Sequence, residues 1–168
     1  MKTRDLRGAI YLAGGIGLLV AIFAAAEYYT ASLRSVCSIN SFLSCGAVDR
    51  SGLTTTLGIP DYAWGIGGFV ALLVVAALAE RSPRDVRPAY ALTALATGAV
   101  GLSGYFLYLQ LGRIHALCIV CATAEFLGGI VWLASIALAL RTSRRASGAG
   151  APSEPPPSPG PERTDPPG

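Results

Sequence analysis

The chain of 168 residues is 52% hydrophobic and only 14% charged, with a formal net charge of +3. A soluble globular domain carries about a quarter charged residues, so this composition excludes an ordinary soluble fold. Three long stretches contain no Asp, Glu, Lys or Arg: 8–26, 62–79 and 89–112. From 114 to 140 only Glu125 and the titratable His115 interrupt a fourth apolar run. Since about 20 apolar residues cross a bilayer, the sequence predicts an all-α membrane protein, a bundle of four transmembrane helices.

The first transmembrane helix is predicted at about 8–28. It follows the basic segment MKTRDLR and ends near AAAE, which also fits a secretory signal with an A-x-A cleavage site. The apolar run is longer than the roughly 7–15 residues of a signal peptide, which favours a retained helix. Residues 29–60 are too few to bury a core of their own. We expect them to form a cap loop between the first and second helices.

The other three transmembrane helices are predicted at 61–79, 89–110 and 117–140. The second begins in the sequence LGIPDYAWG. Pro60 suits the first turn of a helix, and Asp61 suits the positive end of the helix dipole.

Small residues and prolines mark two further features. The third helix contains Gly98, Gly101 and Gly104, and the first contains Gly14, Gly15 and Gly17. We interpret these as residues that let neighbouring helices pack closely. The segment 142–168 holds eight of the eleven prolines, and such a composition buries too little apolar surface to order itself. We therefore expect one transmembrane domain at 1–141 and a disordered, Pro-rich cytoplasmic tail.

The distribution of Lys and Arg predicts the orientation in the membrane. Nine of them flank the helices on one side: Lys2, Arg4, Arg7, Arg81, Arg84, Arg87, Arg141, Arg144 and Arg145. The opposite loops carry three, Arg34, Arg50 and Arg113. Since cytoplasmic loops are rich in Lys and Arg, both termini are predicted to be cytoplasmic and the cap extracytoplasmic, in the inner (plasma) membrane. All four cysteines then lie at or near the outer face, where disulfides form and persist.

The cysteines occur as two pairs, Cys37 and Cys45 in CSINSFLSC and Cys118 and Cys121 in CIVC. A C-x-x-C motif at the first turn of a helix lets the two sulfurs bridge, and the helix N-terminus stabilises a thiolate. Because thiolate is the species that attacks disulfides, Cys118 is the better exchange partner. Cys121 lies one turn deeper, where it faces lipid or a ligand between helices.

Three other kinds of cysteine site compete with this interpretation. A c-type haem site requires C-x-x-C-H, and Ala122 stands where the histidine should be. A four-cysteine zinc site remains an alternative, although the spacings C-x₇-C and C-x₂-C are loose for zinc. The other alternative is that both disulfides are purely structural and only stabilise the cap. That role does not explain why one cysteine pair lies at the membrane edge of a helix.

From about 8 to 140 the sequence resembles the vitamin K epoxide reductase (VKOR) family, and in particular its bacterial quinone-linked members. The resemblance rests on the loop pair CSINSFLSC, on a serine six residues after its second cysteine, on Gly-Ile-Pro entering the second helix, and on CIVC opening the fourth. Disulfide oxidases of the DsbB type also have four helices and two cysteine pairs, but their C-x-x-C lies in the first loop. Many bacterial VKOR members carry a fused thioredoxin-like domain; here we expect a separate redox partner.

The resemblance implies a role for each cysteine. Cys37, the outermost, exchanges with a thioredoxin-fold partner of the DsbA kind. Cys45 passes electrons to Cys118, and Cys121 faces the quinone. Ser51 matches a family serine that steadies the cap near the active site, although its place in RSG also suits an ordinary turn residue.

Two carboxylates are candidate quinone-site residues. Asp61 aligns with a position where vertebrate relatives carry an asparagine that contacts the quinone carbonyl. An ionised Asp only accepts hydrogen bonds, so it would have to be protonated to donate one to that carbonyl. The alternative is that Asp61 is only a carboxylate at a helix N-terminus. Glu125 follows Cys121 by four residues, on the same helix face, where vertebrate enzymes carry a tyrosine. Ionisable residues inside a bilayer are usually functional. We therefore expect Glu125 to donate a proton to the quinone or to tune the reactivity of the Cys121 thiol. The alternative is that Glu125 only forms a hydrogen bond to a neighbouring helix.

The sequence therefore predicts a membrane thiol oxidoreductase. Electrons pass from a thioredoxin-fold protein through both cysteine pairs to a membrane quinone of the menaquinone, ubiquinone or vitamin K type, and disulfides form outside the cytoplasm. No metal and no nucleic acid are expected to take part. One alternative is a reductase of vitamin K quinone or epoxide in a carboxylation cycle. The other is a non-catalytic membrane protein with two structural disulfides.

Overall fold

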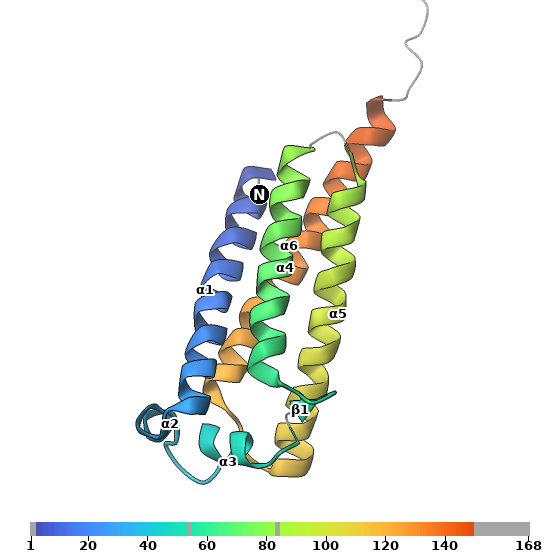
Figure 1. The fold of residues 1–168 in the computed structure, drawn as a ribbon. Helices are drawn as coiled ribbons and strands as arrows, with labels where there is room; N and C mark the ends of the chain where they lie inside the picture. The colour runs from blue at the N-terminus through green and yellow to red at the C-terminus, as the bar shows by residue number, and fades with distance from the viewer. Residues whose placement is uncertain (1–2, 54, 83–84, 150–168) are drawn as a thin grey trace, which may run out of the picture.

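Four long helices lie side by side as a bundle in the computed structural model, which describes residues 3–53, 55–82 and 85–149 (Figure 1). They are α1 (Thr3–Tyr29), α4 (Asp61–Arg81), α5 (Arg87–Leu109) and α6 (Ile119–Ala149). Each helix belongs to a segment long and apolar enough to cross a membrane. The predicted fold class, an all-α four-helix membrane bundle with a cap, is confirmed.

The helices are longer than the apolar runs that predicted them. The first begins at Thr3, before the apolar run, and the last continues to Ala149, into the segment predicted to be a disordered tail. Apolar composition marks only the part of a helix that lies in lipid, whereas helical hydrogen bonding continues until a residue interrupts it. The first proline of the tail is Pro152. The remaining tail prediction, 150–168, falls outside the described residues.

The cap contains four short elements: α2 (Ala31–Cys37), α3 (Cys45–Arg50), β1 (Thr55–Thr56) and β2 (Ile59–Pro60). The two strands form an antiparallel hairpin. Its turn residues, Leu57 and Gly58, both have positive φ values of 56° and 78°, as a two-residue hairpin turn of type I′ requires. In Figure 1 the cap covers one end of the bundle, opposite the start of α1 and the end of α6.

Helix packing uses glycine in α1 but not in α5. A Cβ added at Gly17 would collide with the ring of Phe69 on α4, so the missing side chain lets these helices approach closely. By contrast, a Cβ added at Gly98, Gly101 or Gly104 meets no described atom within 4 Å. The interpretation of these three glycines as packing residues is therefore wrong.

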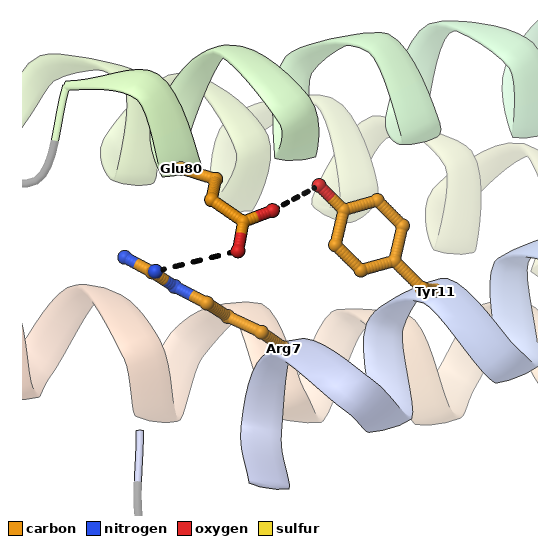
Figure 2. Close-up of polar contacts among 3 residues, drawn as sticks. All are labelled: Arg7, Tyr11 and Glu80. Carbon is orange, nitrogen blue, oxygen red and sulfur yellow. Dashed lines mark hydrogen bonds and ion pairs between the residues drawn. The ribbon is translucent and has the colours of Figure 1, made fainter. Parts of the chain in front are cut away.

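A polar contact joins α1 to α4 at the end opposite the cap (Figure 2). The hydroxyl of Tyr11 donates to Glu80 Oε2 at 3.0 Å, and Arg7 Nη1 lies 3.7 Å from Glu80 Oε1. A partly exposed ion pair of this kind contributes at most about 1 kcal/mol. Its main consequence is to fix a basic side chain at the end of the bundle that carries the predicted cytoplasmic charges.

Candidate functional site: two cysteine pairs beside an apolar cavity

The cap reaches the start of α6 through a short backbone pairing. Leu43 and Leu117 form an isolated parallel β-bridge. The N–H of Leu117 donates to the carbonyl oxygen of Phe42 at 2.7 Å, and the N–H of Ser44 donates to the carbonyl oxygen of Leu117 at 3.1 Å. The Ser44 side chain also caps α3 by accepting the N–H of Ala47 at 3.2 Å. The N-termini of α3 and α6 are thereby held together.

This pairing brings three sulfur atoms into one buried cluster. Cys37 and Cys45 form a disulfide with a Cα–Cα distance of 5.7 Å, and Cys118 is a free thiol. The Sγ atoms of Cys45 and Cys118 are 3.1 Å apart, and Val48 and Ala116 pack around them. The two cysteine pairs therefore meet at Cys45 and Cys118.

The same cluster bears on the zinc alternative. The Sγ atoms of Cys37, Cys45 and Cys118 lie within 4.8 Å of one another, close enough for a shared ion. Metals bind thiolates, however, and two of the three sulfurs are bonded to each other. The arrangement instead suits disulfide exchange, in which a thiol must approach one sulfur of a disulfide.

Cys118 directly precedes α6 and caps its first turn. Its Sγ accepts the backbone N–H of Cys121 at 3.3 Å, the contact that an N-cap side chain makes three residues into a helix. The backbone N–H of Cys118 donates to Oε1 of Gln110 at 2.8 Å. A thiolate at Cys118 thus has a hydrogen-bond donor and the positive end of the helix dipole beside it.

Cys121, one turn further, lies against the first residue of α4. Its thiol donates to Oδ2 of Asp61 at 3.8 Å, while Oδ1 of Asp61 accepts the N–H of Tyr62 at 2.7 Å. The Asp61 carboxylate is therefore both a helix N-terminal group and an acceptor for the Cys121 thiol.

A cavity of about 750 Å³ opens beside Cys121 and is also lined by Asp61 and Glu125. Its walls come from α4, α5 and α6, with a contribution from α1, and are mostly apolar. Gly98 and Gly128 line it, and an added Cβ at either meets no described atom within 4 Å. The glycines thus leave room beside the thiol for a ligand, in the size range of about 300–1,000 Å³ that is typical of ligand pockets.

Ser51 lies away from the cavity, at the end of α3. Its hydroxyl donates to the carbonyl oxygen of Val48 at 2.7 Å and accepts the N–H of Leu53 at 3.2 Å. These are the contacts of a turn residue, and they also secure Val48, which packs against the cysteine cluster. Both interpretations of Ser51 are compatible with this position.

Sequence reasoning missed Gln110. The residue begins a short π-helical segment, Gln110–Ile114, between α5 and α6 and is fully buried. Its backbone carbonyl accepts the N–H groups of His115 and Ala116, and its side chain holds the N–H of Cys118. The one available signal was an amide at the end of an otherwise apolar helix, eight residues before the C-x-x-C motif.

The bundle, the two cysteine pairs and the adjoining cavity together define a membrane protein of the thiol-redox class. The sequence profile of the Vitamin K epoxide reductase family (VKOR) matches residues 9–143. The chain therefore belongs to the VKOR family, and the predicted resemblance is confirmed. No curated protein sequence matches the chain. Family membership and the four apolar helices make it an integral membrane oxidoreductase.

Proposed function

We propose that the protein passes electrons from a separate thioredoxin-fold protein of the DsbA kind to a membrane quinone, and so supports disulfide formation outside the cytoplasm. The observation that supports this most strongly is the 3.1 Å distance between the Sγ atoms of Cys45 and Cys118. Because these atoms belong to different pairs, disulfide exchange has a direct route from one pair to the other. Cys121, the last sulfur of the route, lines the cavity.

The relay proceeds by thiol–disulfide exchange. The dithiol of the partner reduces the Cys37–Cys45 disulfide through a mixed disulfide with Cys37, and the partner leaves oxidised. When Cys118 and Cys121 are disulfide-bonded, the Cys45 thiolate attacks Cys118 and releases Cys121. Cys37 then attacks Cys45, which re-forms the Cys37–Cys45 disulfide and releases Cys118. Two electrons have moved inward to the C-x-x-C pair.

The quinone is the substrate that takes these electrons. The Cys118 and Cys121 thiols lose two electrons and two protons and form a disulfide, while the quinone becomes a quinol. The size and apolar walls of the cavity fit a quinone ring.

The two carboxylates divide the proton transfers. Asp61 Oδ2 lies 3.8 Å from Cys121 Sγ and is placed to accept the thiol proton as this sulfur is oxidised. The resemblance to vertebrate enzymes suggested instead that the residue at this position contacts the quinone carbonyl. In the role proposed here, Asp61 contacts the Cys121 sulfur. Glu125 lines the same cavity and supplies a proton to the quinone.

Substitutions of Glu125 are expected to give a graded loss. Glu125→Gln keeps a hydrogen-bond donor but removes the transferable proton, so turnover falls while the quinone KM stays near wild type. Glu125→Leu also removes the donor and is expected to raise the KM severalfold. Steady-state kinetics at varied quinone concentration separate the two effects. Phe126→Leu, at a residue 70% exposed on the outer face of α6, is the matched control. Wild-type values of both parameters for Glu125→Leu would make Glu125 a packing residue.

The proposal also requires the cap to face an oxidising compartment. A reporter active only in the cytoplasm is expected to work when fused after Arg141, and one active only outside when inserted near Ser51. The basic residues near the chain termini and between α4 and α5 support this orientation. The reverse pattern of reporter activity would place the cysteines in a reducing compartment and exclude disulfide formation as the function.

The function is tested with purified protein in lipid nanodiscs. A reduced thioredoxin-fold protein is mixed with a quinone, and quinol formation is followed by absorbance. We expect turnover only when both substrates and the membrane protein are present. Absence of quinol formation with either a protein dithiol or dithiothreitol as donor would refute the proposal.

A further inference from the structure

The side-chain amide of Gln110 is held in one orientation. It is fully buried, and one of its two polar atoms lies 2.8 Å from the backbone nitrogen of Cys118. Since a backbone N–H requires an acceptor, that atom is the carbonyl oxygen Oε1. The amide nitrogen Nε2 is consequently the group left to face other neighbours.

Nε2 of Gln110 has no hydrogen-bond partner within the described ranges 3–53, 55–82 and 85–149. A buried amide donor without an acceptor is destabilising, and native proteins seldom leave one. Gln110 also lines the cavity that Cys121 and Glu125 line. A ligand in that cavity that carries an acceptor oxygen would complete the hydrogen bonding of this side chain.

We propose that Gln110 Nε2 donates a hydrogen bond to a carbonyl oxygen of the quinone. The inference rests on the proposed function and adds a specific binding residue to it. One amide then joins the electron acceptor to the backbone of the C-x-x-C motif, through Oε1 on Cys118 and Nε2 on the quinone. A donor at the carbonyl oxygen also stabilises the negative charge that develops there during reduction.

A quinone has two carbonyl oxygens, and Glu125 is proposed above to protonate one of them. Two further polar residues of the cavity, Asp61 and Trp64, are less suited to donate to the other. Asp61 is engaged by the Cys121 thiol and the Tyr62 N–H, and an ionised carboxylate can only accept. The indole N–H of Trp64 donates to the carbonyl oxygen of Thr56 at 3.4 Å. The Gln110 amide, in contrast, is a donor in every protonation state of the site.

The first test is kinetic and uses dithiothreitol as donor and decylubiquinone or menadione as acceptor. Gln110→Met keeps the side-chain volume but removes the Nε2 donor together with the Oε1 acceptor of the Cys118 N–H. We expect about a tenfold rise in quinone KM, as for one lost hydrogen bond to the ligand. Gln110→His restores a donor and is expected to recover part of the affinity. Ser135→Ala, which removes a buried hydroxyl bonded to the Trp132 carbonyl, is the control and leaves the KM unchanged. A purely structural role would lower kcat or thermal stability without raising the KM.

The second test is spectroscopic and compares the wild type with Gln110→Met. Menadione labelled with ¹³C at its carbonyls is bound to the protein, and its C=O stretching band is recorded by infrared difference spectroscopy. We expect one carbonyl band at lower frequency than in the absence of protein, and the shift to disappear in Gln110→Met. If wild type reduces the quinone but shows no such shift, or if Gln110→Met keeps the wild-type KM, the Gln110 assignment alone is wrong. If wild type neither binds nor reduces the quinone, the proposed function fails together with it.

Discussion

Replacing Cys121 with Ala is expected to reduce quinone reduction to the uncatalysed background, with a protein dithiol or a small dithiol as donor. Cys118→Ala should do the same. Each change removes one of the two thiols that form the final disulfide, and a single thiol cannot supply the electron pair. Cys121 also lines the cavity in which the quinone is proposed to bind, so no other described cysteine is placed to replace it.

Quinol formation measured against protein concentration checks this expectation. The matched control is Thr123→Ala on the same helix, where an exposed hydroxyl bonds only to the carbonyl oxygen of Ile119 at 2.8 Å. The control should keep wild-type turnover. Substantial activity of Cys121→Ala would mean that electrons leave the protein by a route that does not pass through the C-x-x-C motif.

The outer pair should respond differently to the two kinds of donor. Cys37→Ala is expected to lose activity with a thioredoxin-fold donor but to retain it with dithiothreitol, because a small dithiol can reduce the inner pair directly. In Cys45→Ala mixed with the oxidised partner, the free Cys37 thiolate attacks the partner's disulfide and forms a mixed disulfide, and no Cys45 thiol is present to attack Cys37 and release the partner. We therefore expect this variant to accumulate a covalent complex with the partner, visible as a larger band on a non-reducing gel and lost after reduction.

These variants also separate the redox relay from the structural alternative. Cys37 is only 6% exposed, whereas Ile39 and Phe42 nearby in the cap are exposed. The cap around Cys37 must therefore move before a partner sulfur can reach it. If all four cysteine variants kept full activity and lost only thermal stability, the two pairs would be structural staples.

Much of the fold follows from composition. Four apolar runs predict four helices because the bilayer requires that length. The exact ends do not follow, since α6 continues through Arg141 and Arg144 to Ala149 on helical hydrogen bonds that need no apolar residues. The role of glycine in α5 was also beyond prediction. Small residues serve both close packing and cavity walls, and only the positions of neighbouring helices distinguish Gly17 from Gly98.

The cysteines of the candidate site could be predicted from the sequence, but the contacts between the site residues could not. Sequence spacing identifies the C-x-x-C motif, yet the approach of Cys45 to Cys118 depends on a backbone bridge between Leu43 and Leu117, distant in sequence. Asp61 was placed by its offset in a family pattern, which does not reveal that its carboxylate meets Cys121 Sγ. Gln110 escaped notice because an amide near the end of an apolar helix is ordinary at a membrane interface, and its burial depends on the tertiary fold.

A single-turnover experiment shows whether two electrons leave the C-x-x-C pair for a quinone. The protein is fully reduced, freed of excess reductant and mixed anaerobically with one equivalent of quinone. The thiols that remain on each cysteine are then alkylated and identified by mass spectrometry. We expect one quinol per protein and the loss of two alkylatable thiols, first at Cys118 and Cys121 and later, by exchange, at Cys37 and Cys45. Quinol formation without thiol loss, or four persistent thiols with no quinol formed, would contradict this electron transfer.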